Sequence, residues 1–361
     1  SALQSSAFHT LEAVQENKKH QIEMYLDNLM KNMSTVSELA AVHHTYAKLV
    51  KYHKKHDVQA HQDFPAHGQE WENIISQYDS YFQEYVHDNH LHDLFLICAA
   101  HGHIMYTAAR ESDLGGNLGA GQLKNSHLAD LWRTVVQTHQ PAFQDFEPYA
   151  PSNGKPASFI GVPIIEHGQV AGVVVVQISI KEINTIMNER SGLGETGEAY
   201  LVGPDKLMRS DSYLDPENHS VEASFLNPQK GKVDTEATRE VFNGKSDSKI
   251  ITDYNGNQVL SAYDLVSFHG VDWAVIAEID KNEAFAAVNN IRNLILSLSV
   301  ITLIIVVLVG WYIGSSIANP IVRIIQNLGN SSEQVSAASG QVSSTSEEMA
   351  QASSEQAATV E

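Results

Sequence analysis

The sequence contains very little cysteine and few basic residues. Cys98 is the single cysteine among 361 residues, so no disulfide can form within the chain and a cysteine-based metal site is not expected. Lysine and arginine together number 23, against 43 aspartates and glutamates, which gives a formal net charge of −20. Nucleic acid binding needs a concentrated basic surface, so the composition argues against that class of protein.

The motifs of the common enzyme classes are also missing. The glycine-rich run Leu114–Gly121 lacks the Lys-Ser/Thr pair of a phosphate-binding loop and does not match GxGxxG after a strand. GxSxG, HExxH and CxxC do not occur. We therefore expect a binding protein that is not an enzyme and needs no cofactor.

One long stretch lacks charge altogether. Residues 294–317 carry no charged side chain, and about 20 apolar residues are enough to span a bilayer. Trp311 and Tyr312 near its end suit a membrane interface. We predict a transmembrane helix over 293–317, with a buried core helix as the alternative. Basic residues lie on both sides of the run, so the positive-inside rule does not decide its orientation.

The residues before this stretch change from a helical to a strand pattern. Residues 8–40 have apolar side chains at helical spacing, and no proline occurs before Pro65, which predicts one long amphipathic helix. A further helical region is predicted over 41–90. From there on, short apolar runs between turn residues predict strands. The predicted strands include 94–98, 103–107 and 169–179, and a helix is predicted over 128–136.

The order of these elements recurs after about 100 residues. The segment Pro163–Val173 matches Leu265–Val275, with Gly168 and Gly270 as the paired turn glycines. A repeat of this length with strands in the same order suggests two copies of one α/β module. The alternative is a chance resemblance between two hairpins.

The end of the chain is rich in serine, alanine, glutamate and glutamine, a composition that is typical of disorder. Its apolar residues nevertheless recur every seventh position, at Ile321, Leu328, Val335, Val342 and Met349. This spacing predicts a long helix for a multi-helix bundle.

The layout resembles a methyl-accepting chemotaxis receptor with a double Cache (dCache, PAS-like) sensor domain. The motif SGLGETGEAYLVGPDKLMRSDS at 191–212 is similar to the start of the membrane-proximal Cache module, and the tail SSTSEEMAQASSEQAATVE at 343–361 resembles the first signalling helix of such receptors. Asn319-Pro320-Ile321 resembles the start of a HAMP linker, but a full HAMP unit is absent, so a continuous helix is expected there.

The resemblance implies an α+β fold. A long N-terminal helix would accompany two PAS-like antiparallel-sheet Cache modules, followed by a transmembrane helix and a coiled-coil signalling helix. The implied parts are a helical stalk over 1–90, a membrane-distal module over 91–190, a membrane-proximal module over 191–290, a transmembrane helix over 293–317 and the start of a cytoplasmic signalling helix over 318–361.

The resemblance also implies a place and a function. The chain would be a homodimeric transmembrane receptor of the inner membrane that binds a small ligand in an extracytoplasmic (periplasmic) sensor. Its cytoplasmic tail would act on a histidine kinase through a chemotaxis adaptor. A first membrane helix before Ser1 and more signalling helix after Glu361 are expected. The alternatives are the sensor part of a membrane histidine kinase or nucleotide cyclase, and a metal or pH sensor.

The first module is the expected ligand site, because ligand pockets are mostly apolar with a few placed polar groups. In the stretch Tyr149–Gly154, we expect Pro151 and Gly154 to fix a lip over the pocket, with Tyr149 and Asn153 facing the ligand. The alternative is that the aromatic candidates are core residues and the polar ones turn residues. The predicted ligand-binding residues are Tyr106, Asp113, Trp132, Phe146, Tyr149, Asn153, Phe159 and Gln177.

The resemblance bears on the ligand class as well. Double Cache receptors for amino acids usually have an acidic residue late in the last long strand, and Gln177 stands at that position here. A neutral amide holds a cation less well than a carboxylate does. A free amino acid is therefore not the first expectation, and a small organic acid or another polar metabolite stays open.

Histidines are crowded in the first part of the chain, with eleven of the 18 between residues 43 and 103. His87, His90 and His92 are weak metal-ligand candidates, since imidazole binds zinc or nickel, and on a helix His87 and His90 would share a face. A solvated polar segment is the alternative, so no metal is predicted. A pH response through these histidines stays open.

In the second module, a few polar residues could line a smaller pocket. We expect instead that Arg209 and Asp211 form a structural ion pair. The residues considered for that pocket are Glu195, Tyr200, Arg209 and Asp211.

Overall fold

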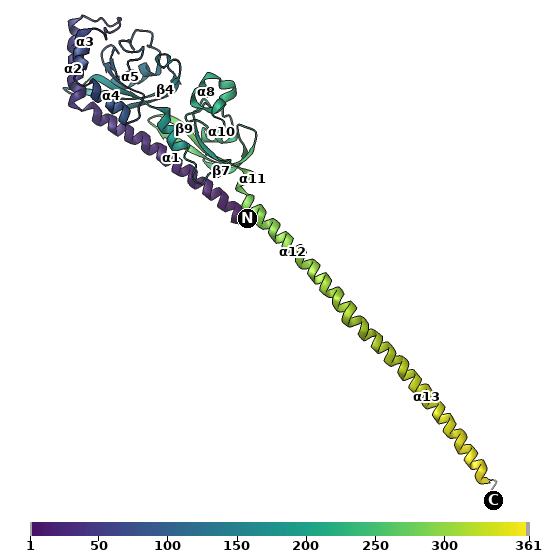
Figure 1. Cartoon of the computed structure of the whole chain (residues 1–361). Coiled ribbons are helices and arrows are strands. Elements are labelled where there is room, and N and C mark those ends of the chain that lie inside the picture. The colour runs from purple at the N-terminus through teal and green to yellow at the C-terminus, as the bar shows by residue number, and fades with distance from the viewer. Residues whose placement is uncertain (1, 359–361) are drawn as a thin grey trace. The chain divides into compact units, whose positions relative to one another are not determined.

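The structure, a computed structural model, describes residues 2–358 (Figure 1). The chain separates into two compact units, Ser1–Ala286 and Ala287–Glu361. The first unit holds both sheets, and the second is helical. This agrees with the predicted α+β class with antiparallel sheets, a long N-terminal helix and a long apolar C-terminal helix.

The helices of the first unit lie mainly before and between the strands. They are α1 (Ala2–Ser37), α2 (Ala40–Lys55), α3 (Gln69–Ile75), α4 (Asp79–Asp88), α5 (His127–Thr138), η1 (Ala150–Ser152), α6 (Ile180–Met187), α7 (Pro216–His219), α8 (Val221–Leu226), α9 (Pro228–Gly231), α10 (Glu236–Val241) and α11 (Lys281–Ala284). The strands are β1 (Asp93–Cys98), β2 (Ile104–Thr107), β3 (Ala142–Pro148), β4 (Pro156–Glu166), β5 (Gln169–Gln177), β6 (Glu198–Val202), β7 (Asp247–Thr252), β8 (Gln258–Phe268) and β9 (Val271–Asp280).

Within residues 2–358 the strands form two antiparallel sheets, ordered β2-β1-β5-β4-β3 and β6-β9-β8-β7. Apart from β2, the two orders are the same, which confirms the predicted internal repeat. In the second sheet the place of β2 is taken by an isolated bridge between Val202 and Met208. The repeat predicts a returning strand there, equivalent to β2, and the structure reduces it to one paired residue.

The paired glycines of the repeat sit in matching hairpin turns. His167 and Gly168 have φ of 51° and 79°, and His269 and Gly270 have φ of 48° and 85°. Two successive residues with positive φ are typical of the type I′ turn, whose twist matches that of the flanking strands. Glycine adopts this conformation without steric cost, which explains why it recurs at the same place in both modules.

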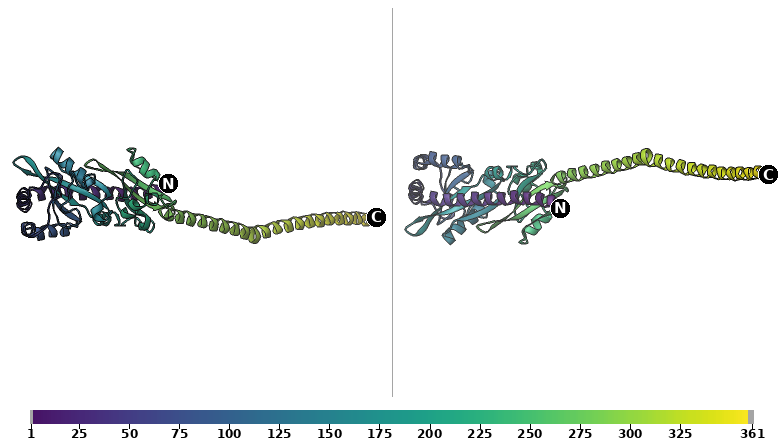
Figure 2. Two further views of the ribbon diagram at one scale, coloured as in Figure 1. Left: turned by 90° about the horizontal axis from the view of Figure 1, so that it is seen from above. Right: turned by 90° about the horizontal axis from the view of Figure 1, so that it is seen from below.

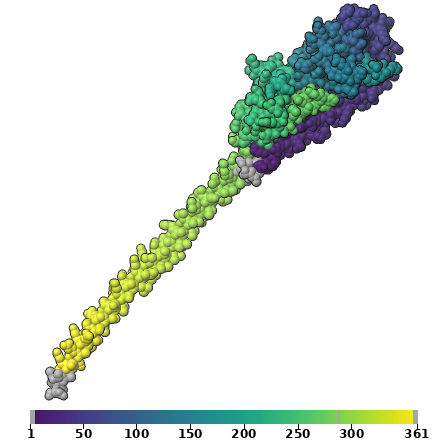
Figure 3. All heavy atoms as spheres, turned by 180° about the vertical axis from the view of Figure 1, so that it is seen from behind, coloured from purple at the N-terminus to yellow at the C-terminus, as the bar shows by residue number. Residues whose placement is uncertain are grey.

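Helix α1 runs along both sheets of the first unit (Figures 1 and 2). Its apolar side chains at helical spacing, among them Ile22, Leu26 and Met33, are fully buried, as expected for an amphipathic helix. The space-filling view shows α1 forming one edge of this unit (Figure 3). The helical region predicted over 41–90 is interrupted, because residues 56–68 form a loop between α2 and α3.

The core of the five-stranded sheet β2-β1-β5-β4-β3, hereafter the distal sheet because its module is the one expected to lie away from the membrane, is covered by α5. The helix begins after Ser126, whose Oγ accepts a hydrogen bond from the Ala129 N–H, and ends at His139 in a left-handed conformation. Its buried face packs on side chains of β1, β4 and β5. That buried cluster contains Phe95, Ile97, Leu128, Leu131, Trp132, Val135, Tyr149, Phe159, Val173 and Val175. The opposite face of β1 and β2 is covered by α4, where Phe82 contacts Tyr106.

The two sheets are joined by a buried ionic contact. Arg209 donates from Nε and Nη2 to the two carboxylate oxygens of Asp145, at 2.8 and 2.7 Å. Trp273 Nε1 donates to the same carboxylate at 2.9 Å. The predicted pairing of Arg209 with Asp211 is wrong, because Asp211 instead accepts from Asn184 Nδ2 at 2.7 Å. Arg209 is held by a residue of the other sheet, which spacing along the chain could not indicate.

The second unit is an uninterrupted run of helix. It comprises α12 (Ala286–Ile313), a π-helical segment η2 (Gly314–Ala318) and α13 (Asn319–Ala358). Pro320 has no N–H to donate to the preceding turn, which accounts for irregular helix geometry just before it. Among the described residues, this run contains one helix that is long enough and apolar enough to cross a membrane, judged by length and composition. The end of the chain is helical as far as residue 358, as the seven-residue spacing predicted.

Candidate ligand-binding site

Strand register brings polar side chains together at one end of the distal sheet. Asp93 at the start of β1 pairs with Gln177 at the end of β5. Phe159 of β4 pairs with Gln177 from the other side. Side chains directly opposite one another lie on the same face of a sheet, so these three residues share the face that α5 covers.

This cluster contains buried acceptor oxygens without a donor. Asp93 accepts at Oδ1 from the backbone N–H groups of Leu94 and Ala109, at 2.6 and 2.8 Å. Asp113 accepts from Tyr149 Oη at 2.9 Å, and Gln177 Nε2 donates to Ser152 Oγ at 3.3 Å. The other acceptor of each side chain has no hydrogen-bond donor among the residues of the described part of the chain. These atoms are Asp93 Oδ2, Asp113 Oδ1 and Gln177 Oε1.

Burial changes the electrostatics of the two aspartates. It raises the pKa of Asp93 to about 7, and the nearby Asp113 carboxylate adds to the effect. Burial likewise raises the pKa of Asp113 to about 6, although the hydrogen bond from Tyr149 opposes it. The pKa of Tyr149 is also raised, first by burial and then by Asp113. A buried carboxylate without a cation is costly, so the site favours a positively charged or donor-rich partner.

A short lip covers this cluster. It is the 3-10 helix Ala150–Ser152, which ends at Asn153 in a left-handed conformation with φ of 58°. Gly154, with φ of 76°, donates its N–H to the carbonyl of Tyr149 at 3.0 Å. Ser152 Oγ donates to Glu111 Oε2 at 3.0 Å. The lip is thus held to the module by one side-chain contact to Glu111 and one to Gln177.

A surface cavity of about 390 Å³ opens beside the lip. Gln177 and Ser152 line it and also reach the buried cluster, so they form the wall between the two. Lys155 and Lys181 are at the cavity as well. The remaining lining residues include His92, Glu111, Asn153, Pro156, Ile178 and Glu222.

The structure brings half of the predicted ligand-binding residues together. Tyr149 and Asp113 are hydrogen-bonded, Phe159 packs edge-on against Tyr149 with ring centroids 5.1 Å apart, and Gln177 is paired with Phe159. Asn153 is exposed at the rim of the cavity. The lip residue that reaches the cluster is Ser152, its neighbour in the turn.

The other three predicted residues lie elsewhere in the module. Trp132 donates from Nε1 to the carbonyl of Cys98, at the far end of β1. Tyr106 lies on the opposite face of the sheet and donates to Asp79 at 2.9 Å. Phe146 stacks on Trp273 of the second sheet. These are packing roles, which was the alternative that the sequence left open.

Sequence reasoning missed Asp93, Ser152 and Glu111. Asp93 carried one signal, since it is the charged residue at the start of an apolar strand that is buried throughout. A charge is rarely fully buried unless it is paired or functional. Ser152 and Glu111 carried none, because their contact depends on how the lip folds over the loop after β2.

The histidines considered as metal ligands do not form a cluster. Helix α4 ends at Asp88, so His90 lies beyond it and does not share a helical face with His87. His87 contacts Asp88 at the surface, and His92 Nε2 lies 3.1 Å from Glu111 Oε1.

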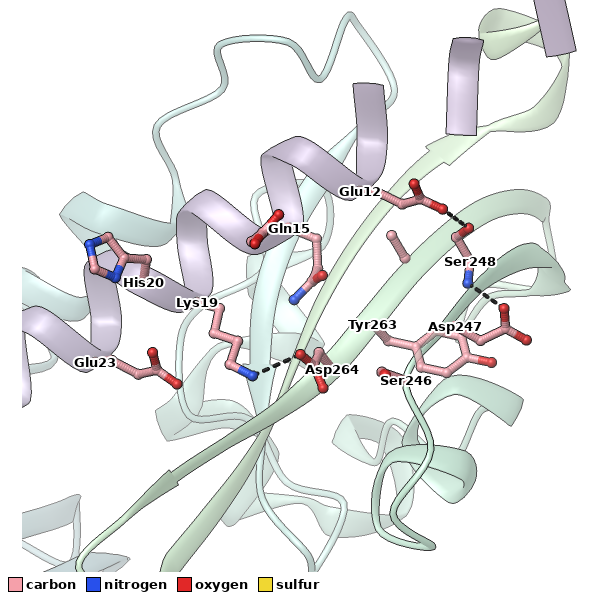
Figure 4. Close-up of a pocket in the computed structure, with 12 residues that line it drawn as sticks. Glu12, Gln15, Lys19, His20, Glu23, Ser246, Asp247, Ser248, Tyr263 and Asp264 are labelled. Atoms are coloured by element: carbon pink, nitrogen blue, oxygen red, sulfur yellow. Dashed lines mark hydrogen bonds and ion pairs between the residues drawn. The ribbon is translucent and has the colours of Figure 1, made fainter. Parts of the chain in front are cut away.

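Two further polar places lie outside this cluster. A groove of about 470 Å³ lies between α1 and the strands β7 and β8 (Figure 4). There Lys19 Nζ donates to Asp264 at 2.7 Å, and Ser248 Oγ donates to the Glu12 carboxylate. In the second module Tyr200, considered for a smaller pocket, is buried and donates to Glu278 at 2.8 Å. Glu278 Oε1 is itself a buried acceptor without a donor in the described part of the chain, so this place has one unsatisfied carboxylate oxygen, whereas the distal module has two, on Asp93 and Asp113.

Comparison with known proteins agrees with this architecture. A family model described as the Cache domain (dCache_1) matches residues 1–288. This chain belongs to the Cache domain family. No curated protein matches the chain.

Solved structures similar to this Cache protein are ligand-binding domains of bacterial chemoreceptors. That of Pseudomonas fluorescens CtaA, in complex with L-isoleucine, has 14% identity and a TM-score of 0.50, with 79% of this chain and 97% of that chain covered. The periplasmic sensory domain of Campylobacter jejuni Tlp1 has 13% identity and a TM-score of 0.48, covering 76% and 95%. At 14% identity, the likeness to the CtaA domain shows a shared fold.

Proposed function

We propose that this Cache protein is a chemoreceptor sensor that binds a small ligand carrying a protonated amine in its membrane-distal module. The observation that supports this is the set of buried acceptors without donors on Asp93, Asp113 and Gln177. An ammonium group carries donors and a positive charge, so it would satisfy these oxygens and offset the cost of burying two carboxylates. Tyr149 and Phe159 would form the apolar wall beside it.

This ligand class departs from the expectation drawn from Gln177. That expectation depended on a single residue, Gln177, near the end of β5. Two carboxylates come instead from Asp93 on the neighbouring strand and from Asp113 in the loop after β2. An amino acid therefore falls within the proposed class, and a small organic acid without an amine does not.

Ligand entry would require the lip to move. Asp93 and Asp113 are both fully buried behind Ser152 and Gln177. An amine entering from the cavity would displace the contacts of Ser152 to Glu111 and Gln177. The carboxylates would then be ionised by their new partner, so binding releases protons. Affinity should rise as pH increases through about 6 to 7, the raised pKa values of Asp113 and Asp93.

The remaining parts of the chain fit a receptor. We propose the division into a stalk over 1–90, modules over 91–190 and 191–290, a membrane span over 293–317 and a cytoplasmic signalling helix from 318 onward. The proposal includes a homodimer that acts on a histidine kinase through a chemotaxis adaptor. Ligand binding could shift signalling only if one state of the receptor bound the ligand better. A membrane kinase or cyclase with the same sensor is the second candidate.

A thermal-shift screen of the full chain in detergent tests the ligand class. The panel pairs small amines and amino acids with the matching carboxylic acids that lack the amino group. A ligand that binds only the folded state raises the melting temperature, so we expect shifts with amines alone. Asp113→Asn and Asp93→Asn should remove the shift, and Asp130→Asn, a change at an exposed side chain of α5 paired with Arg133, should keep it.

Two results would contradict the proposal. A shift produced by the carboxylic acids, or one that survives Asp113→Asn and Asp93→Asn together, would place the ligand elsewhere.

A further inference from the structure

A second cluster of side chains lies at the other end of strand β1. His53 comes from α2, Cys98 is the last residue of β1, and His101 and His103 lie in the turn that follows it. Each offers one ligand atom, and these atoms all lie within 4.8 Å of one another. No sequence pattern connects His53 with this turn, and the single cysteine argued against a cysteine-based metal site.

Hydrogen bonding fixes which nitrogen of His103 carries the proton. Its Nε2 lies 2.9 Å from the carbonyl oxygen of Gln62, which can only accept, so Nε2 carries the proton. The same carbonyl also accepts from Asn117 Nδ2 at 2.8 Å. In a neutral ring Nδ1 then has a lone pair, and it points at His53 Nε2, 2.8 Å away. A histidine whose second nitrogen donates to a backbone carbonyl is the usual arrangement of a metal ligand.

His101 completes the group of imidazoles. Its Nδ1 is buried and has no hydrogen-bond partner within the part of the chain that the structure describes. The His101 ring is stacked on His53 with centroids 5.8 Å apart, and its centroid lies 5.4 Å from that of His103. Three imidazoles thus converge on one place, and imidazole is the commonest metal ligand in proteins.

Cys98 supplies the soft ligand. Its thiol is 8% exposed. Backbone N–H groups of the turn 100–103 approach the sulfur. A bound cation deprotonates a coordinating thiol outright. The sulfur therefore lies in surroundings that suit a metal thiolate.

We propose that His53, Cys98, His101 and His103 form a binding site for a late first-row transition metal ion of the zinc type. Three imidazoles and one thiolate are the ligand types that zinc prefers, and four ligands give its usual tetrahedral geometry. Zinc lies about 2.0–2.1 Å from nitrogen and about 2.3 Å from sulfur. The most widely spaced ligand atoms, up to 4.8 Å apart, would need to close by roughly 1 Å, which small side-chain rotations supply.

The metal would tie α2 to the distal sheet. The site is separate from the amine site, because Asp93 and Cys98 lie at opposite ends of the strand, about 17 Å apart at about 3.3 Å per residue. This proposal does not depend on the proposed ligand.

Zinc titration of the full chain tests the site. The protein is purified in detergent without a histidine tag, treated with a chelator and titrated calorimetrically with Zn²⁺, Ni²⁺ and Cu⁺ in parallel. We expect about one Zn²⁺ per chain with micromolar affinity or better, as four-ligand sites give. Cys98→Ser and His103→Asn should each weaken binding by about tenfold or more. His87→Asn, at an exposed histidine outside the cluster, is the matched control.

Co²⁺ binding gives an absorption signal that would not depend on Cys98 if this residue had only a structural role. Co²⁺ bound by a thiolate absorbs in the near ultraviolet, and that band should disappear in Cys98→Ser. If that variant folds poorly, His53→Asn replaces a half-buried side chain on the surface of α2, with the melting temperature in chelator as the folding check. The proposal would be overturned if the number of metal ions bound per chain were unchanged in both His53→Asn and His103→Asn. It would also be overturned if none of the metals bound at micromolar protein.

Discussion

Replacing Asp145 with asparagine tests the contact that joins the two sheets. The Asp145 carboxylate receives hydrogen bonds from Arg209 Nε, Arg209 Nη2 and Trp273 Nε1. The Arg209 side chain is only 3% exposed and that of Asp145 is 17% exposed. Asparagine keeps the shape but removes the negative charge and puts an amide donor against these donors.

The magnitude follows from burial. Removing one partner of a buried ion pair costs about 3–5 kcal/mol, because the other charge stays buried without compensation. Arg209 keeps a second contact, to Asp205 at 3.0 Å, whose side chain is 42% exposed. That contact offsets part of the loss, so we expect a decrease of about 3 kcal/mol in the free energy of unfolding.

Urea denaturation of the full chain, followed by tryptophan fluorescence, measures this change. The matched control is Asp130→Asn in the exposed pair of Asp130 with Arg133, where the loss should stay below about 1 kcal/mol. The double variant Asp145→Leu with Arg209→Met removes both charges and should recover most of the stability. Equal losses for Asp145→Asn and Asp130→Asn, or no recovery in the double variant, would refute the reasoning.

Three further predictions concern packing, pH and the membrane. In Gly172→Ala, a Cβ would lie 2.4 Å from the ring of the buried Tyr46, so we expect unfolding in urea to become easier by about 1–3 kcal/mol. Burial raises the pKa of Glu278 from 4.5 to about 8, so the folded chain holds an extra proton between these values. The free energy of unfolding should therefore fall by up to about 1.4 kcal/mol per pH unit as pH rises through that range, and Glu278→Gln should remove this share of the slope in denaturation curves. Leu303→Arg in α12 should reduce membrane insertion, measured by fractionation, since arginine costs about 2.5–3.5 kcal/mol at the centre of a span.

Much of the fold could be predicted because its signals are local. Apolar residues at helical spacing predicted α1, and short apolar runs between turn residues predicted β1, β2 and β5 within one or two residues. The matching His-Gly turns at Gly168 and Gly270 revealed the repeat, since each turn specifies its own hairpin. The loop over 56–68 was missed because helical composition continues on both sides of it.

The candidate site could be predicted only in part. Tyr149, Asp113, Phe159 and Gln177 were placed in one pocket because they surround the same strands and turn. Tyr106 lies outside this cluster, since one residue of strand register moves a side chain to the opposite face. Phe146 was included because nothing in its own segment shows that the second sheet covers it.

The sequence by itself determined the helices, the strands, the repeat and the apolar span, because each depends on neighbouring residues along the chain. Tertiary structure decided which charges meet. The register between β1 and β5 placed Asp93 beside Gln177, and the return of α2 placed His53 beside Cys98. Both clusters join residues far apart in the chain, and burial gives their atoms a chemistry that no local pattern encodes.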